Sequence, residues 1–212
     1  ESIIEDNPEM EDFIAQLGEG SITDAFLSTS VVILALMATS FTVASVLRLR
    51  SEELADRADP VLATRTPRYR WATIHVTVAV VGTVVVMLTT GLLIGVGLAA
   101  ASGDASKIGP VVGASMAMVP AMLVFAGVAL ALFGLSPRWS ILTWGFFAFA
   151  VVVGLLGAVL DLPQWVMNLS PFEHVPAMPS AAFDWVPVVG LSVGAVLVAS
   201  VGLWLLDRRD IA

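Results

Sequence analysis

Arginine supplies nine of the ten basic side chains that could hold an anionic partner, and these nine arginines fall at three places. They lie within 48–70, at 138 and at 208–209, whereas the lone lysine, Lys107, lies in a different loop. Long apolar segments separate these places, and short loops rich in Lys and Arg remain in the cytoplasm. The pattern therefore predicts one cytoplasmic side of a membrane, with the first residues outside and the last residues inside.

Catalytic chemistry has few candidate residues here. The chain has no cysteine, which excludes disulfides, thiolate catalysis and cysteine metal sites. We expect His75 to be a packing residue and His174 to tie its turn to nearby backbone, because a single His without partner ligands is weak evidence for a metal. No Gly-x-x-x-x-Gly-Lys-Ser/Thr phosphate loop occurs, so any ATP must be bound by a partner. We therefore expect no catalytic residue, metal site or cofactor in this chain.

Composition indicates an integral membrane protein. Of its 212 residues, 58% are hydrophobic and 13% are charged, and the mean hydropathy is +0.91, whereas a soluble domain has about 25% charged residues. The apolar segments are continuous runs and lack the ten-residue alternation of barrel strands. We expect an all-α, polytopic helix bundle. The acids gather on the predicted outer side, which suits neither nucleic acid nor anionic lipid as a partner.

Five segments are long enough to cross a hydrocarbon core of about 30 Å. The expected spans are Ala25–Leu47, Trp71–Leu98, Gly109–Leu135, Trp139–Leu160 and Trp185–Leu206, followed by a cytoplasmic tail at 207–212. None of the spans contains Asp, Glu, Lys or Arg, which argues against a proton- or ion-coupled carrier. Glycines four residues apart predict close approaches between helices. These pairs are Gly91 with Gly95, Gly109 with Gly113, and Gly190 with Gly194.

Two outer segments accompany the spans. Within 1–24 we expect a short amphipathic helix that has Pro8 at its first position and ends near Gly18, followed by a capping box at 21–24 that opens the first span. We interpret this helix as a lid resting on neighbouring spans. Four prolines within 162–184 forbid one continuous helix, so we expect two short half-helices that dip into the outer leaflet.

The cytoplasmic segment 48–70 is longer than a connection between two helices requires. Its first part, Leu49–Ala58, has helical composition, with acids and Arg57 spaced for ion pairs, and Asp59-Pro60 ends it. A structured segment with charges of both signs is typical of a docking surface. A solvated, salt-bridged elbow explains the same spacing, and spacing alone leaves both interpretations open.

Two stretches of the chain, together with its last residues, resemble a known family. The stretches are Ser51-Glu52-Glu53…Arg57-Ala58-Asp59-Pro60-Val61-Leu62-Ala63-Thr64…Arg68-Tyr69-Arg70-Trp71…His75, then Leu162-Pro163-Gln164-Trp165…Leu169-Ser170-Pro171-Phe172…His174-Val175-Pro176, and the terminal Asp207-Arg208-Arg209-Asp210-Ile211. They resemble the ABC-2 type permeases, most closely the branch of actinobacterial polyketide-antibiotic and multidrug exporters. The resemblance spans essentially the whole chain. The loop departs from the usual family pattern at two positions of its local turn: Arg65 stands where a proline is common, and Pro67 stands where a small polar residue is common.

The resemblance implies the C-terminal half of a larger permease in a bacterial plasma membrane. Five spans with an outer start fit a six-helix half that lacks its first helix, and a chain that begins with Glu is expected to continue a longer polypeptide. The implied function is export of hydrophobic or amphipathic small molecules, of the antibiotic or multidrug class. The implied partners are the bilayer, the other permease half and an ABC ATPase dimer that holds the ATP and Mg²⁺.

The resemblance also implies three groups of site residues. A coupling helix within 50–64 would dock on the ATPase, with exposed charges and apolar plugs: Glu52, Glu53, Arg57, Asp59, Val61, Leu62 and Thr64. The first and fourth spans would line the substrate path: Thr39, Thr42, Ser45, Phe146, Phe147 and Phe149. An outer gate would use Trp165, Phe172 and His174. Ordinary helix packing is the alternative explanation of the small residues in the first span.

Two other hypotheses remain at this point. The chain could be a membrane scaffold or regulatory subunit that transports nothing, or, with the least support, a membrane enzyme. An exporter permease should retain an ATPase on purification, whereas a scaffold need not.

The arginine distribution makes a topological prediction. Cysteines introduced at Asp12, Asp104 and Asp161 should react with an impermeant thiol reagent from outside intact cells. Cysteines at Ala58 and Ser136 should react only after permeabilisation. Labelling in the reverse pattern would show that the orientation, and the cytoplasmic assignment of 48–70, is wrong.

Overall fold

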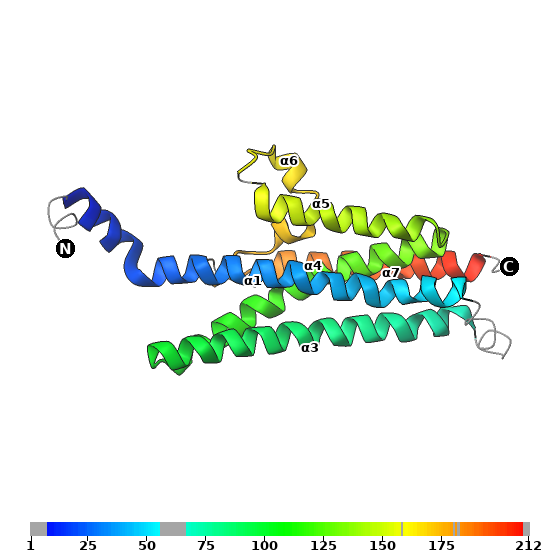
Figure 1. The fold of residues 1–212 in the computed structure, drawn as a ribbon, viewed down its shortest axis with the longest axis horizontal. Coiled ribbons are helices and arrows are strands. Elements are labelled where there is room, and N and C mark those ends of the chain that lie inside the picture. Colours follow the sequence, from blue (N-terminus) through cyan, green and yellow to red (C-terminus); the bar gives the residue numbers. More distant parts are fainter. Residues whose placement is uncertain (1–7, 56–66, 158, 180, 182, 210–212) are drawn as a thin grey trace.

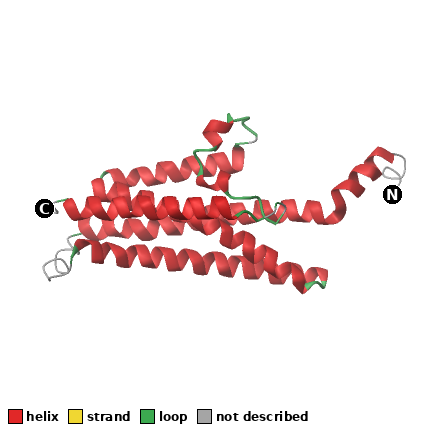
Figure 2. Ribbon diagram, turned by 180° about the vertical axis from the view of Figure 1, so that it is seen from behind, coloured by secondary structure: helices red, strands yellow, loops and turns green. Residues whose placement is uncertain are grey.

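A computed structural model describes residues 8–55, 67–157, 159–179, 181 and 183–209, and within 8–22 it describes only the backbone. It is a bundle of long helices, with no strand among the described residues (Figures 1 and 2). The long helices are α1 (Pro8–Leu54), α3 (Arg68–Ser102), α4 (Ile108–Leu135), α5 (Leu142–Leu156) and α7 (Trp185–Arg208). The short segments are η1 (Ala105–Lys107), η2 (Trp139–Ile141), α6 (Gln164–Met167) and η3 (Pro171–His174).

Five helical stretches are long and apolar enough to cross a membrane. This confirms the expected all-α membrane fold and its five spans. The end of α1, the start of α3 and the end of α7 lie together at one end of the bundle, and the turn between α3 and α4 lies at the other (Figure 1). Arg50 contacts the turn after α4 that contains Arg138, so the described arginines of all three places lie at one end, as the charge pattern predicts.

Local sequence sets several helix ends. Gly103 adopts a left-handed conformation with φ of 71° and donates its N–H to Ala99 O at 2.8 Å, which ends α3. At the start of α7, Asp184 Oδ1 accepts the N–H of Val186 at 2.9 Å and so satisfies a backbone donor that has no partner within the helix. These ends are fixed by short-range interactions and precede any packing between helices.

The expected break after the amphipathic segment is wrong. Instead of one helix that ends near Gly18 and another that starts after the capping box at 21–24, the structure has the single helix α1. An interior glycine costs about 1 kcal/mol relative to alanine, which weakens a helix without ending it. The first turns of α1 leave the axis of the bundle, so the segment does not lie as a lid on the neighbouring spans (Figure 1).

The fourth span is also shorter than expected. It consists of η2 and α5 and ends at Leu156 rather than Leu160. Beyond this end, Leu162 donates its N–H to Gly157 O at 3.1 Å, and Asp161 has a φ of 48°. Asp tolerates this left-handed conformation better than most residues because its short polar side chain can bond locally. The left-handed turn therefore lies at Asp161, directly after the last residue of the expected span.

Helix α4 occupies the centre of the bundle, where it contacts α1, α3 and α7. Its side chains Met118, Met122, Phe125, Leu130 and Phe133 are fully buried. The central position follows from composition, since α4 carries apolar or small residues around its whole circumference and can be covered on all sides.

Glycine permits the closest helix contacts of α4. On the α3 side, a Cβ added at Gly91 would lie 2.9 Å from Val112 Cα, which confirms the expected close approach. On the α7 side, a Cβ at Gly202 would lie 2.7 Å from Ala131 N, and one at Gly134 would overlap Gly202 O. The sequence pattern missed this second contact, because Gly134 and Gly202 are on different helices and have no glycine four residues away.

Two of the three expected glycine pairs do not mediate close contacts between the described helices. A Cβ at Gly109, Gly190 or Gly194 would meet no atom within 4 Å, and one at Gly113 would meet only Met178 Cε at 3.9 Å. Spacing places two glycines on one helix face, but it does not place another helix against that face.

The proline-rich outer segment forms the two short helical pieces that the sequence predicts, α6 and η3. Ser170 lies between them with extended backbone, and Pro171 is the first residue of η3, which suits its fixed φ. The depth of these pieces in a bilayer stays a prediction.

The contact between α4 and α7 can be tested by substitution. Gly202→Val should lower the free energy of unfolding by about 2 kcal/mol or more, because the new side chain has to displace the backbone of α4. Gly190→Val is the matched control, since it adds the same atoms to an open face of the same helix. The thermal midpoint of the purified protein in detergent measures both, and equal midpoints would contradict the assigned packing.

Candidate coupling site at the basic end of the bundle

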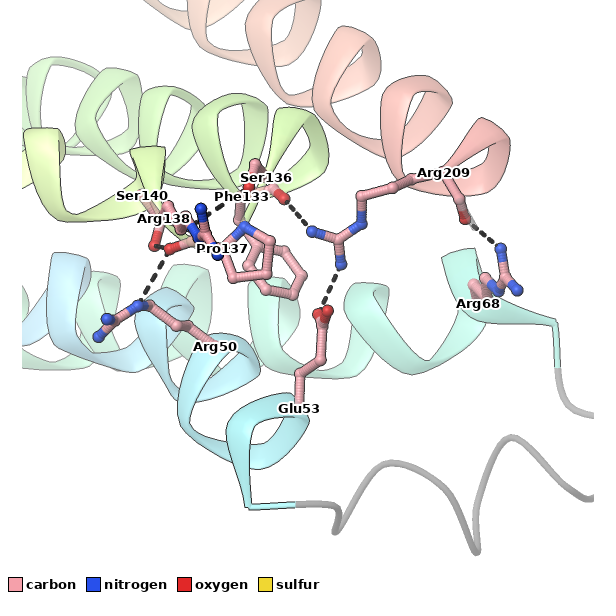
Figure 3. Close-up of polar contacts among 9 residues, drawn as sticks. All are labelled: Arg50, Glu53, Arg68, Phe133, Ser136, Pro137, Arg138, Ser140 and Arg209. Atoms are coloured by element: carbon pink, nitrogen blue, oxygen red, sulfur yellow. Dashed lines mark hydrogen bonds and ion pairs between the residues drawn. The ribbon is translucent and has the colours of Figure 1, made fainter. Parts of the chain in front are cut away.

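The ends of four helices are joined by polar contacts at the arginine-rich end of the bundle (Figure 3). We call this region the basic end. Its principal residues are Arg50, Glu52 and Glu53 on α1, Arg68, Trp71 and His75 on α3, Phe133 on α4, Pro137 in the turn that follows α4, and Arg209 directly after α7.

Glu53 and Arg209 form the central ion pair of the basic end. Arg209 Nη2 lies 2.5 Å from Glu53 Oε2, and the two side chains are 14% and 15% exposed. An exposed ion pair adds almost nothing to the free energy of unfolding, because water and salt screen it. The pair of Glu53 and Arg209 is better shielded from both and should therefore contribute more. The contact joins the end of α1 to the end of α7, which are 156 residues apart in the sequence.

Arg209 makes further contacts with α4 and α3. Its Nη1 donates to Phe133 O at 3.0 Å, and its guanidinium carbon lies 4.9 Å from the centre of the Phe133 ring. Arg68 donates to the backbone oxygen of Arg209. Arg209 Nε is buried without a hydrogen-bond partner among the described residues. A single residue at the end of α7 thus contacts the other three helix ends.

Glu52, the residue directly before Glu53, joins α1 to α3. Its Oε2 accepts the indole N–H of Trp71 at 3.1 Å and lies 3.1 Å from His75 Nε2. Trp71 is buried, and its ring meets His75 and Phe133 edge-on. His75 is therefore a hydrogen-bonded packing residue in this structure, as expected from the sequence. Its side chain supports the orientation of Glu52 and Trp71.

Arg50 connects α1 to the turn after α4. Its Nε donates to Pro137 O at 3.0 Å, and the hydroxyl of Ser140 donates to the same oxygen at 2.7 Å (Figure 3). Pro137 O follows the end of α4 and has no helical partner, so these donors satisfy an acceptor that would otherwise need water. The position of η2, and with it the start of α5, is thereby tied to α1.

The structure separates the predicted coupling residues into two groups. Glu52 and Glu53 lie in the last turn of α1, and Arg57, Asp59, Val61, Leu62 and Thr64 lie outside the described residues. The expectation that both acids are exposed for docking is wrong, because Glu53 is shielded by its pair with Arg209 and Glu52 is held by α3. The part of Glu52 and Glu53 in coupling stays a prediction. Their contacts suggest that they would act by linking α1 to α3 and to the end of α7, and not by binding the ATPase directly.

The predicted path residues of α1 are buried against its neighbours. Thr39 and Thr42 are fully buried and Ser45 nearly so. The hydroxyl oxygens of Thr42 and Thr83 of α3 are 2.7 Å apart, and Thr39 donates to Ala35 O at 2.7 Å. In this conformation the stripe has the arrangement of ordinary helix packing, the alternative that the sequence left open.

The predicted path residues of α5 belong to an aromatic cluster with two other elements. Phe125 of α4 stacks on Phe146 with a centroid distance of 4.8 Å and meets Phe147 edge-on at 6.2 Å. Phe172 of η3, predicted to be part of an outer gate, also stacks on Phe125, with a centroid distance of 5.8 Å. Phe149 is half-buried and contributes no ring contact to this cluster. The cluster brings predicted path and gate residues together through Phe125, which the sequence analysis did not single out.

The other two gate residues lie apart from the cluster. Trp165 is 69% exposed on α6. His174 Nε2 lies 2.8 Å from Asn168 O, which confirms that His174 ties its turn to nearby backbone. No group of three or more potential metal ligands is present among the described residues.

Sequence reasoning missed the central role of Arg209. Its position beside Arg208 in the terminal run gave no signal that one arginine pairs while the other does not. In the structure, Arg208 lies over the exposed ring of Trp204 at 4.0 Å, and Arg209 turns toward the bundle. The two directions differ because α7 ends at Arg208 and Arg209 adopts an extended conformation. A helix end is hard to place within one residue from sequence.

Comparison with known proteins gives two agreeing results. A family model described as the C-terminal domain of the multidrug efflux system permease Rv1217c matches residues 1–206. The multidrug efflux system permease protein Rv1217c of Mycobacterium tuberculosis is 31% identical over 208 residues, which are 97% of this chain and 38% of that permease. The chain therefore spans less than two-fifths of the length of this relative. Both results confirm the resemblance drawn from the sequence motifs.

The ion pair at the basic end makes a stability prediction. Arg209→Ala should lower the free energy of unfolding by roughly 1–3 kcal/mol, because it leaves the shielded carboxylate of Glu53 without its partner. Arg208→Ala, which removes the same side chain from an exposed position, should change it by less than about 1 kcal/mol. Thermal midpoints of the purified variants compare the two. Equal losses would mean that the pair contributes no more than a surface charge.

Proposed function

The chain belongs to the family of the C-terminal domain of the multidrug efflux system permease Rv1217c, and from this membership we propose that it is the membrane-spanning part of an ATP-driven exporter. The proposed cargo is a hydrophobic or amphipathic small molecule of the antibiotic or multidrug class. ATP and Mg²⁺ are held by a separate ATPase dimer, and a second permease half completes the pathway. The family match over nearly the whole chain carries the proposal, supported by five apolar spans.

The basic end suggests how force from an ATPase reaches the membrane. The segment that joins α1 to α3 faces the cytoplasm in the proposed orientation and is the site of docking. Glu52 links the end of α1 to α3, Glu53 links it to α7, and Arg50 links it to the turn after α4. A displacement of this segment therefore acts on four helix ends together. Rigid linked elements of this kind transmit small displacements better than independent helices do.

The substrate path is proposed to involve α1 and α5, which contact each other and also pack on α4. The small polar stripe of α1 is closed by α3, as the contact between Thr42 and Thr83 shows. For Thr39 and Thr42 to contact a substrate, α1 has to separate from α3 during transport. The aromatic cluster around Phe125 contains the α5 residues Phe146 and Phe147, and its large apolar rings suit an amphipathic molecule.

Co-purification and transport test the proposed function directly. The intact protein should retain an ABC ATPase, and the complex in proteoliposomes should show ATP hydrolysis that is stimulated by a transported compound. Leu62→Asp should abolish retention and export, because the new charge would be buried without a partner at the docking surface. Leu62→Val is the matched control and should retain both. An intact, correctly inserted protein that binds no ATPase would instead support the scaffold hypothesis.

A cross-link tests whether α1 and α3 separate. The chain has no native cysteine, so Thr42→Cys with Thr83→Cys introduces one pair at positions whose side chains already touch. If the stripe lines the path, oxidation should stop drug-stimulated export and reduction should restore it, while each single variant stays active under oxidation. Full export by the cross-linked protein would show that the stripe serves packing alone.

A further inference from the structure

A cavity of about 620 Å³ opens at the end of the bundle opposite the basic end. It lies between α1, the turn from α3 through η1 to α4, and the segment that follows η3. Leu27 and Val111, both buried, form part of its wall, and Leu98 extends this apolar surface along α3. Its volume is in the range of pockets that hold small molecules, and it is lined by no residue of the aromatic cluster or of the basic end.

The same cavity carries charges of both signs from two separate elements. Asp24 comes from α1, whereas Asp104 and Lys107 come from the turn around η1. Asp104 Oδ1 is held in place by the hydroxyl of Ser106 at 2.6 Å and by the backbone N–H of Ser106 at 3.0 Å. These hydrogen bonds, with a smaller effect of Lys107, keep the pKa of Asp104 below its ordinary value and favour its charged form.

The walls of the cavity are connected across the fold. Ser28 Oγ lies 2.8 Å from Asp24 O and 3.1 Å from Ala177 O. This contact holds the segment after η3 against α1, and Pro179 of that segment lines the cavity. The cavity is thus a product of tertiary packing between elements that are far apart in the sequence.

The charges limit what the cavity can bind. A simple anion would be repelled by the two carboxylates, and a simple cation would leave Lys107 facing a positive ligand. A ligand with an ammonium and an anionic group close together can pair with the carboxylates and with Lys107 at the same time. An apolar tail on this ligand can pack against the wall formed by Leu27, Leu98 and Val111. The position at the end of the membrane spans, where lipid head groups lie, favours a lipid over a soluble zwitterion.

We propose that this cavity binds a phospholipid whose head group carries a primary ammonium. The ammonium lies between Asp24 and Asp104, the phosphate lies at Lys107, and an acyl chain follows the apolar wall beside Leu98. The bound lipid joins α1 to the turn between α3 and α4. It therefore braces the outer end of the same two helices that Glu52 joins at the basic end.

Native mass spectrometry of the intact protein tests this proposal. The protein is released from nanodiscs that contain equal amounts of phosphatidylethanolamine, phosphatidylcholine and phosphatidylglycerol, and the bound lipids are counted. Phosphatidylethanolamine should be retained over the other two by about fivefold or more, because phosphatidylcholine has no ammonium hydrogen to donate and phosphatidylglycerol has no cation. Equal retention of the three lipids would overturn the proposal.

Substitutions assign the preference to the cavity. The double variant Asp24→Asn with Asp104→Asn should abolish the preference for phosphatidylethanolamine. Asparagine at position 104 can still accept the hydrogen bonds of Ser106. Lys107→Gln, an exposed change that folding should tolerate, should lower the retention of all three lipids, because each of them carries the phosphate. Asp161→Asn is the matched control, since it removes one acid from the same end outside the cavity and should leave the preference unchanged. If Asp161→Asn lowers retention as much as the cavity variants do, the effect is general surface charge and the proposal fails.

Discussion

Helices α4 and α7 approach so closely at Gly134 and Gly202 that neither position has room for a Cβ. In lipid the hydrophobic effect does not drive helices together. Small residues stabilise the association of helices because they let the backbones pack closely. The contact lies one residue from Phe133 and seven residues before Arg209. It therefore sets the distance at which Arg209 reaches the backbone oxygen of Phe133 and, beyond it, Glu53 of α1.

The polar contacts of the bundle divide between its ends and its interior. Interior hydroxyls such as those of Thr39 and Ser115 bond to backbone oxygens four residues earlier in their own helices, and Thr42 with Thr83 forms a bond between two helices. Ion pairs and arginine contacts lie at the basic end. Charged groups are costly within a hydrocarbon core, so strong directional contacts between helices are available only near its boundaries. In the proposed orientation, the basic end is therefore the part of the bundle that an ATPase would contact.

The aromatic cluster and the outer cavity show two ways in which η3 and the residues after it shape the outer half of the bundle. Phe172 reaches Phe125 in the centre of α4, and Ala177 and Pro179 close the cavity against α1. An irregular segment near a membrane has to satisfy its backbone within the protein. The hydrogen bond between His174 Nε2 and Asn168 O satisfies one such backbone oxygen, and the buried Phe172 helps to position the residues around both features.

The sequence by itself determined the number of spans, the common end of the described arginines, the helical breaks in the proline-rich segment 162–184 and the family, because apolar length, charge and a high density of proline act locally or by simple counting. It also predicted the local bond of His174. Only the tertiary structure decided that α1 continues through Gly18, that Gly134 and Gly202 rather than Gly190 and Gly194 mediate contact, and that Arg209 rather than Arg208 pairs with Glu53. These outcomes depend on which helix faces lie together. That choice is made by packing between residues far apart in the chain, and periodicity within one helix carries no information about it.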